Sequence, residues 1–202
     1  LLYEFFGDRL WRSQDGVSRS EAVKRGLALQ VSSSQEFVSL CVTNRGAALV
    51  NEAALTLLDL PDDYLSRGFP IDPNANADMD FYAFPGLQCR LTRNLDKDRG
   101  FVNGAVGTVR QVLKHCRGRP IVFTVELQNH VMVVVHLIRH EKRIFPPCIY
   151  GYTTTIRRSQ GATYDHGCIY FDLCYPLEQG CGYVAASHFR TQDGIDLYGH
   201  IR

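Results

Sequence analysis

Short apolar runs and amphipathic stretches alternate over the first part of the chain. Residues Phe37–Val42 form a mostly apolar run of strand-forming residues, which is typical of a buried parallel strand. Thr43-Asn44 follows and can cap a helix. The apolar side of that helix would carry Ala47, Val50, Ala54, Leu57 and Leu58. The pattern therefore predicts a strand–turn–helix unit.

From Leu87 onward the pattern changes to strand-like runs. Residues 121–127 and 131–138 are rich in β-branched side chains and flank Gln128-Asn129-His130, which is typical of a hairpin. We expect residues 86–140 to form a small antiparallel β-barrel. Before it, residues 61–85 form a long acidic loop with four prolines, which is typical of a crossing between domains.

Strand–turn–helix alternation returns after the barrel. We expect a strand that ends at Ile156, a helix over 157–163, a strand over 168–172, a helix over 183–187 and a last strand over 195–198. Residues 36–85 and 141–202 would thus form one α/β domain with a parallel sheet, interrupted by the barrel. Residues 1–35 are hard to assign, although Phe5, Phe6, Leu10 and Trp11 suggest one helical stripe.

Composition narrows the choice of function only slightly. The chain has 202 residues and a net charge of +1, which neither demands nor excludes a nucleic-acid partner. Charge is segregated, however, because Pro85–Pro120 holds two acids against eight bases. The bases are Arg90, Arg93, Lys97, Arg99, Arg110, Lys114, Arg117 and Arg119. They indicate either a surface that meets phosphates or a solvated face of a surface hairpin.

Other features argue against metal, disulfide and membrane classes. The seven cysteines include no C-x-x-C pair, so reduced thiols in an intracellular compartment fit better than a knuckle or a disulfide framework. Nucleus, mitochondrion and bacterial cytoplasm are not distinguished. His136 and His140 follow a strand-like run, where their spacing makes no ligand pair, so we expect no metal. No run of 18 apolar residues exists, so we expect no membrane span.

Two segments contain the residues with the clearest candidate functional roles. Arg143–Thr163 ends in Thr155-Ile156-Arg157-Arg158-Ser159-Gln160-Gly161-Ala162-Thr163. A hydroxyl and basic side chains at a strand end can hold DNA phosphates, and a glycine allows close backbone approach. A surface turn with accidental polarity is the alternative. The second segment, Gly182–Ile195, contains Tyr183-Val184-Ala185-Ala186-Ser187-His188-Phe189-Arg190.

These segments resemble motifs V and VI of superfamily 1 DNA helicases of the Pif/RecD-like type. The first is similar to T-I-H-K-S-Q-G-x-T and the second to Y-V-A-x-S-R-x-R, with His188 at the position of the arginine finger. Two further segments are similar to the start of the inserted barrel and to the opening of the second motor domain. They are Gly86–Val109 and Leu40–Asn51.

The resemblance implies a RecA-like second motor domain of an ATP-dependent 5′-to-3′ helicase. Thr155, Arg157 and Arg158 would bind single-stranded DNA, while Gln160, Gly161 and His188 would face the nucleotide. ATP and Mg²⁺ would belong to the full-length parent, and we expect this chain to bind neither stably. No G-x-x-x-x-G-K-[ST] occurs and the chain starts without Met, so we expect a fragment whose partner is a missing N-terminal motor domain.

A second interpretation stays open at this stage. His188 is shorter than the arginine it replaces and mostly neutral at pH 7 in its unperturbed form. The chain could therefore be a truncated or decayed helicase domain that binds nucleic acid or protein without turnover.

Overall fold

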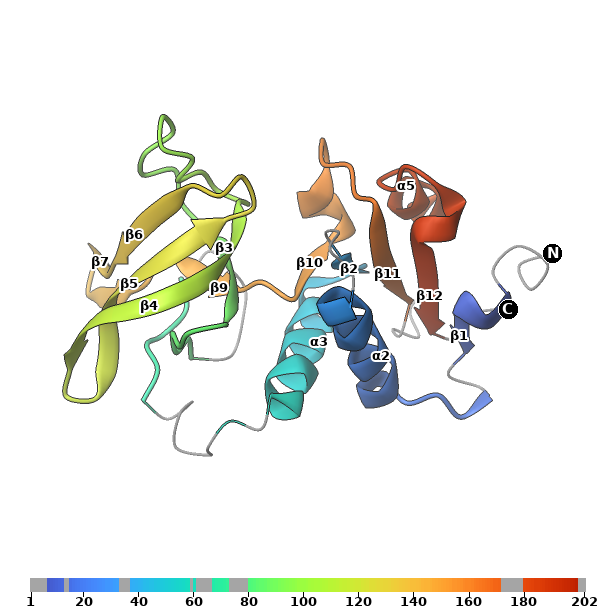
Figure 1. Cartoon of the computed structure of the whole chain (residues 1–202), viewed down its shortest axis with the longest axis horizontal. Helices are drawn as coiled ribbons and strands as arrows, with labels where there is room; N and C mark the ends of the chain where they lie inside the picture. Colours follow the sequence, from blue (N-terminus) through green and yellow to red (C-terminus); the bar gives the residue numbers. More distant parts are fainter. Residues whose placement is uncertain are drawn as a thin grey trace. The chain divides into compact units, whose positions relative to one another are not determined.

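A computed structural model of the chain (Figure 1) describes residues 7–12, 15–32, 37–58, 60, 67–72, 80–171 and 180–199. The chain divides into two compact units. The first unit comprises Leu1–Asp59 and Tyr152–Arg202, and the second comprises Leu60–Gly151. The second unit is therefore inserted in the chain of the first.

The first unit is built on a five-stranded sheet in the order β1-β12-β11-β2-β10. Every pair of neighbouring strands in it is parallel. The strands are β1 (Leu10–Arg12), β2 (Phe37–Cys41), β10 (Thr153–Thr155), β11 (His166–Phe171) and β12 (Ile195–Gly199). The parallel α/β sheet predicted from the sequence is confirmed.

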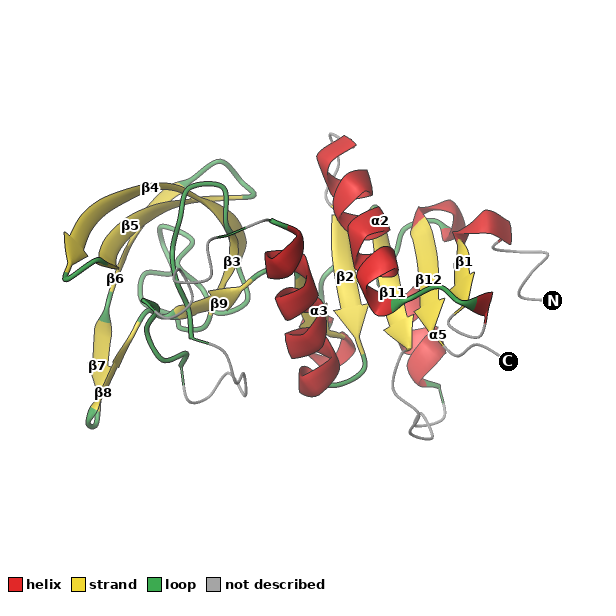
Figure 2. Ribbon diagram, turned by 90° about the horizontal axis from the view of Figure 1, so that it is seen from below, coloured by secondary structure: helices red, strands yellow, loops and turns green. Residues whose placement is uncertain are grey.

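Helices cover both faces of this sheet (Figure 2). They are α2 (Arg19–Ser32), α3 (Asn44–Leu57) and α5 (Cys181–Ala186), together with the short 3-10 helices η1 (Gly7–Arg9), η4 (Ile156–Ser159) and η5 (Gln192–Gly194). On one face, the hydroxyl of Tyr170 donates to the carbonyl oxygen of Ala22 in α2 over 3.5 Å. Because side chains alternate along a strand, Ile169 points to the opposite face, where it joins a cluster with Ala185 of α5.

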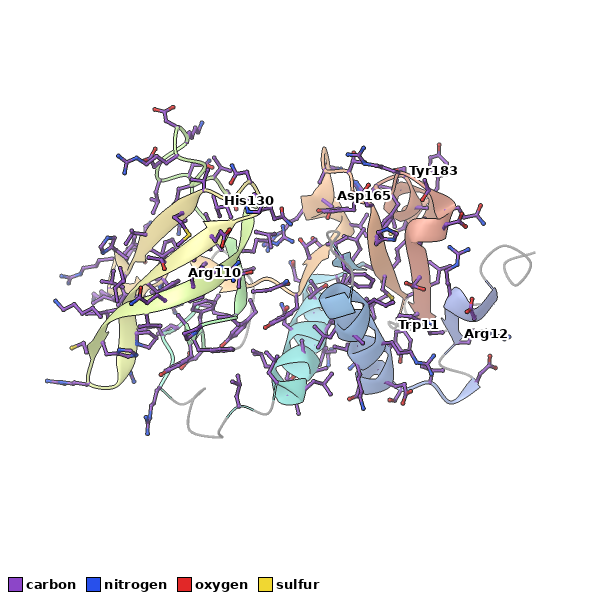
Figure 3. The ribbon with its side chains drawn as sticks, in the orientation of Figure 1. Trp11, Arg12, Arg110, His130, Asp165 and Tyr183 are labelled. Carbon is purple, nitrogen blue, oxygen red and sulfur yellow. The ribbon has the colours of Figure 1, made fainter. Side chains whose placement is uncertain are left out.

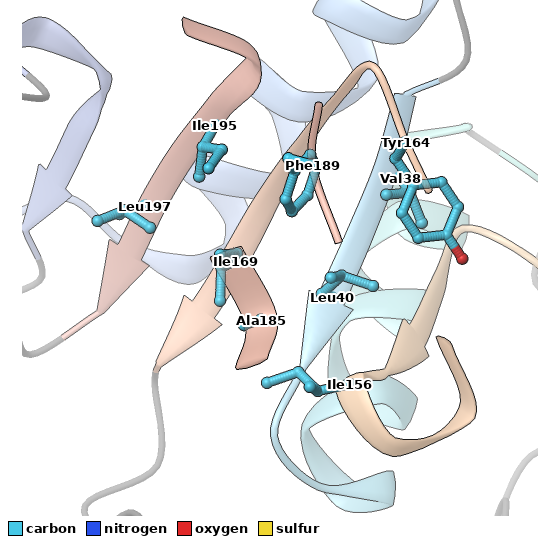
Figure 4. Packing of buried hydrophobic residues seen from close by; sticks show 9 residues of the cluster. All are labelled: Val38, Leu40, Ile156, Tyr164, Ile169, Ala185, Phe189, Ile195 and Leu197. Atoms are coloured by element: carbon cyan, nitrogen blue, oxygen red, sulfur yellow. The ribbon is translucent and has the colours of Figure 1, made fainter. Parts of the chain in front are cut away.

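That cluster is the core under α5 (Figure 4). It comprises Val38, Leu40, Ile156, Tyr164, Ile169, Ala185, Phe189, Ile195 and Leu197. Its members come from strands β2, β11 and β12, from η4, from the segment between η4 and β11, and from α5 and the residues that follow it. The same packing that buries this apolar face therefore fixes the two segments that resemble helicase motifs.

The N-terminal segment differs from the prediction. Leu10 and Trp11 belong to strand β1 instead of a helical stripe, and Phe5 and Phe6 lie outside the described residues. The prediction was wrong because β1 pairs along its whole length with β12, a tertiary contact that local periodicity does not encode. Trp11 is 5% exposed, and the guanidinium of Arg25 lies 5.8 Å from the centre of its ring.

Two predicted helices also need correction. The helix expected over 157–163 is only the 3-10 turn η4, which ends at Ser159 before Gly161, a residue with φ of +85°. In α3, Leu58 follows the helix and is exposed, whereas Leu55 is buried beside Val50 and Ala54. The apolar face of α3 is therefore rotated slightly from the predicted one.

The second unit contains a separate antiparallel sheet in the order β6-β5-β4-β3-β9 and a small hairpin of β7 and β8. Its strands are β3 (Gln88–Leu91), β4 (Val106–Cys116), β5 (Arg119–Leu127), β6 (Met132–His136), β7 (Ile138–His140), β8 (Arg143–Phe145) and β9 (Cys148–Tyr150). The predicted hairpin around Gln128-Asn129-His130 is confirmed as the connection of β5 to β6.

Aromatic packing and one buried ion pair hold this second unit together. Phe81 packs against Tyr150 and Phe123, with ring centroids 5.0 and 6.1 Å away. The guanidinium of Arg93 donates to both carboxylate oxygens of Asp72, over 2.6 and 2.9 Å. Asp72 is 1% exposed, so this bidentate pair fixes the segment before β3 to the end of β3.

Candidate functional site

The turn from β10 into η4 lies where two strands of the parallel sheet end together. Thr155, the last residue of β10, is in register with Cys41, the last residue of β2. The Thr155 hydroxyl accepts the backbone N–H of Arg158 over 3.4 Å and caps η4. Because Thr155 is only 6% exposed, its side chain shapes the turn from inside.

The residues after Thr155 present charge and backbone to solvent. Arg157 and Arg158 are both exposed on the single turn of η4. Gln160 and Gly161 are also exposed, and the φ of +85° at Gly161 reverses the chain direction at low steric cost. The structure therefore brings four of the predicted site residues onto one exposed turn, with Thr155 beneath them.

His188 lies in a different setting. It follows the C-terminus of α5, is 7% exposed, and its Nδ1 lies 3.1 Å from the carbonyl oxygen of Ala162. Because a carbonyl only accepts, Nδ1 carries the proton in this bond. Within the described residues, the other ring nitrogen, Nε2, is enclosed and has no hydrogen-bond partner. His188 thus joins the two motif-like segments to each other and offers no exposed cation.

A second link between these segments was not predicted from the sequence. Tyr164 and Phe189 form a parallel bridge, in which the Tyr164 amide donates to the carbonyl oxygen of His188 over 2.8 Å. Next to it, Arg190 Nε lies 3.0 Å from an Asp165 carboxylate oxygen, and both side chains are partly exposed. Local patterns contain no signal for this pairing, because the partners lie about 25 residues apart in the chain.

Burial shifts the pKa values of three groups on strands β11 and β12 of the parallel sheet. Burial raises the pKa of Asp196 on β12 from 3.8 to about 6, although the nearby Arg9 guanidinium opposes the shift and Asp8 adds to it. Burial also raises the pKa of the Cys168 thiol and of the Tyr170 phenol on β11. Both remain neutral, so we assign them no acid–base role.

Metal-binding and membrane features are not seen in the part of the chain that the structure describes. No group of three His, Cys, Asp or Glu side chains there is placed to hold a metal ion. Among the same residues, no helix has the length and hydropathy that a membrane span needs.

Sequence comparison finds helicases. The chain is 31% identical over 122 residues to ATP-dependent DNA helicase PIF1 of Danio rerio, which aligns 54% of this chain with 18% of that protein. It is 32% identical over 126 residues to ATP-dependent DNA helicase Pif1 of Bdellovibrio bacteriovorus, which aligns 56% of this chain with 26% of that protein. No protein-family model matches the sequence. The matched region is therefore a small part of each relative.

Structural comparison finds the same fold over nearly the whole chain. Pif1 helicase from Bacteroides, solved with ADP-AlF3 and single-stranded DNA, has a TM-score of 0.62 at 19% identity and covers 94% of this chain and 46% of its own. Pif1 helicase from Candida albicans has a TM-score of 0.61 at 18% identity and covers 88% of this chain and 49% of its own.

The chain is therefore similar to Pif1 DNA helicases, in sequence over about half of its length and in fold over most of it. The chain spans about half of the length of the solved helicases and 18 to 26% of the length of the curated ones.

Proposed function

We propose that the chain is the second motor domain of an ATP-dependent 5′-to-3′ DNA helicase. In this role it grips single-stranded DNA and completes a nucleotide cleft with another motor domain. The observation that carries the proposal is the β10–η4 turn, on which Arg157 and Arg158 are exposed at the carboxyl end of a parallel sheet. Open α/β sheets bind ligands at that edge. The single-stranded DNA in the Bacteroides Pif1 structure supports the same partner.

The neighbouring strand adds a second favourable element at this edge. Because Thr155 and Cys41 are in register, η4 and the first turn of α3 begin at the same side of the sheet. Thr43 caps α3 by accepting the backbone N–H of Gly46 over 3.0 Å. Free N–H groups and the dipole of a helix start favour an anion. A phosphate backbone crossing this edge would meet both elements.

The contacts would be made to phosphates, without reading base sequence. Each guanidinium is permanently charged and can donate two parallel hydrogen bonds to a phosphate. Thr155 would act from below by holding the Arg158 amide, and hence the turn, in place. We therefore assign phosphate binding to Arg157 and Arg158 and positioning of the turn to Thr155.

Fewer residues support the proposed contact with a nucleotide than support the proposed contact with DNA. Gln160 and Gly161 are exposed and fit a surface that faces a nucleotide. His188 does not fit a contact with the terminal phosphate, because Nδ1 is engaged by Ala162 and Nε2 is enclosed. ATP with Mg²⁺ would supply the free energy that moves the two motor domains. The residues of this chain would line only one side of the site that binds ATP and Mg²⁺.

The enclosed His188 favours a second candidate function. A helicase domain that has lost its arginine finger would still bind nucleic acid or protein, but without turnover. The sequence that precedes Leu1 in the gene separates the two candidates. A phosphate-binding loop G-x-x-x-x-G-K-[ST] there supports the motor, and a stop codon or an unrelated exon supports the binding module.

A binding titration tests whether Arg157 and Arg158 bind single-stranded DNA. Wild-type chain and the variant R157A/R158A are titrated onto a fluorescent single-stranded oligonucleotide at low salt. We expect wild-type binding in the range of about 1 to 100 µM and roughly tenfold weaker binding by the variant. A matched control is K24A/R25A, which removes two adjacent exposed bases from α2 and leaves the turn intact. Equal loss in both variants, or no loss in the first, contradicts the proposal.

A further inference from the structure

Strand β6 (Met132–His136) forms one edge of the antiparallel sheet of the second unit (Figure 1). Among the described residues, its only neighbouring strand is β5. Edge strands of native proteins are usually protected from pairing with another chain by Lys, Pro or a β-bulge. Residues 131–136 are Val-Met-Val-Val-Val-His, and their register with β5 runs without a shift. β6 therefore has none of these protections.

The backbone of β6 presents hydrogen-bond donors and acceptors at this open edge. The Leu127 amide donates to the Val131 carbonyl oxygen over 2.9 Å, so these two residues form a hydrogen-bonded pair. Such pairs alternate along an antiparallel ladder, and every second residue of β6 therefore bonds to β5. The N–H and C=O groups of the other residues, Met132, Val134 and His136, point away from β5. Within the described residues, these outward groups have no hydrogen-bond partner.

Exposed apolar side chains adjoin these backbone groups. Met132 and Val134 are about half exposed on the outer face of β6, and Val131, which precedes them, is also exposed. A strand that pairs with this edge would supply the missing hydrogen bonds and would also cover part of this apolar surface. The edge is therefore suited to the addition of another strand.

The charges beside β6 do not oppose such a pairing. Glu126 of β5 lies opposite Met132 and is the charged side chain nearest to β6 in the ladder. Its carboxylate contacts Arg110 over 2.6 Å and His130 over 3.1 Å (Figure 3). The charge of Glu126 is therefore compensated by side chains of the same sheet and of the β5–β6 turn.

We propose that β6 pairs with β6 of a second copy of this chain. The outward groups of Met132, Val134 and His136 are spaced symmetrically about Val134. Two antiparallel β6 strands therefore match when a two-fold axis passes between their Val134 residues. Val134 then lies opposite Val134 of the second copy, and Met132 lies opposite His136. Each of these pairs exchanges two hydrogen bonds, which gives about six and uses all the outward groups of β6.

A second copy fits this edge in charge as well as in hydrogen bonding. His136 lies opposite Met132, so no two ionisable side chains of β6 face each other across the axis. The Val134 side chains meet each other and shield apolar surface. An interface with a two-fold axis requires this self-complementarity, and it closes after two copies. The pairing goes beyond the proposed function, because it needs neither DNA nor a nucleotide.

Sedimentation velocity of the whole chain, without DNA or nucleotide and from low to high micromolar concentration, tests the pairing. We expect a reversible equilibrium between monomer and dimer. V134K alone, or V134E alone, places two like charges opposite each other and should weaken association roughly tenfold or more. An equimolar mixture of V134K with V134E should form a heterodimer, because opposite charges then face each other.

A matched control places the same charge on the same row of the sheet. Gln111 of β4 lies opposite Thr124 of β5, which lies opposite Val134, so Gln111 is two strands away from the open edge. Gln111 is exposed, and Q111K should associate like wild type. R157A/R158A should also associate like wild type, so a failure of the pairing and a failure of the proposed function are separate results.

Circular dichroism and thermal melting show whether the variants fold. If V134K or V134E melts below wild type, M132K/H136E and M132K/H136K take their place. These two variants differ only in whether residue 136 of one copy attracts or repels residue 132 of the other, and only M132K/H136E should associate.

Several results overturn the pairing. One is a wild-type chain that stays monomeric, even if it binds a synthetic peptide of residues 130–137, because the edge would then accept a peptide and not a second copy. Others are a dimer that survives in V134K, a mixture of V134K with V134E that stays monomeric, and a loss of association in Q111K as large as in V134K. Assemblies that grow beyond the dimer contradict the closed two-fold arrangement.

Discussion

His188 Nδ1 donates to the carbonyl oxygen of Ala162 over 3.1 Å and joins the end of α5 to the segment that follows η4. Asn has an amide N–H near the place of Nδ1, whereas Gln places its amide nearer to Nε2. We therefore predict that H188N destabilises the chain less than H188Q, by about 1 kcal/mol, the usual net value of one hydrogen bond. Urea unfolding followed by circular dichroism measures the difference. Equal stability of the two variants is the contrary result.

Breaking the ion pair of Arg93 and Asp72 should destabilise the protein more than replacing His188. Replacing Arg93 by Ala leaves the carboxylate of Asp72, which is 1% exposed, without its main cation. We predict a loss of about 3 kcal/mol in the free energy of unfolding of the second unit. R99A is the matched control, because Arg99 and Asp96 form an exposed pair expected to contribute less than about 1 kcal/mol. Similar losses in both variants in urea melts contradict the assignment.

The raised pKa of Asp196 makes the stability of the folded chain depend on pH. Its pKa is about 6 in the folded chain and near 3.8 when exposed, so between these values the folded state keeps a proton that the unfolded state has lost. The contribution of this group to stability is therefore greatest below pH 3.8, falls as the pH rises to about 6, and is constant above it.

D196N removes the titrating group and keeps its shape. We predict that at pH 8 this variant is more stable than wild type by roughly 1 to 3 kcal/mol. The difference should shrink as the pH falls below 6. Denaturant melts at pH 4.5, 6 and 8 measure it, and a difference independent of pH is the opposing result.

Catalysis gives a further prediction. The chain contains no G-x-x-x-x-G-K-[ST], which holds and polarises ATP phosphates. We predict that the chain alone releases no phosphate from ATP, with or without single-stranded DNA. A coupled phosphate assay checks this against a buffer blank and a preparation of H188A. Release that exceeds the blank and follows the protein concentration is incompatible with the prediction.

The sequence revealed the sheets more readily than the N-terminal helix. Apolar runs such as Phe37–Val42 predicted buried strands correctly, because a strand in a parallel sheet is apolar on both faces. Helix α2 was missed because its apolar periodicity is weak. Ser18 and Glu21 nevertheless have the spacing of a capping box, and the Glu21 amide donates to the Ser18 hydroxyl over 3.1 Å.

The candidate site was only partly visible in the sequence. Arg157 and Arg158 were named as site residues from the sequence, but a helix was expected over 157–163, where the structure has the short turn η4 after Thr153-Thr154-Thr155. The enclosure of His188 depends on Ala162, 26 residues earlier in the chain, and on the packing of α5 over the sheet. No local pattern encodes such a contact, so the departure from arginine was visible in the sequence but its structural consequence was not.

The dependence of single-strand affinity on salt tests the central claim most directly. If Arg157 and Arg158 each contact one phosphate, R157A/R158A should flatten the slope of log affinity against log salt by up to about 1.4. K24A/R25A should keep the wild-type slope, because α2 covers a face of the sheet and not its carboxyl edge. Anisotropy titrations at several salt concentrations give these slopes. A double variant with the wild-type affinity and slope would show that DNA does not cross the β10–η4 turn.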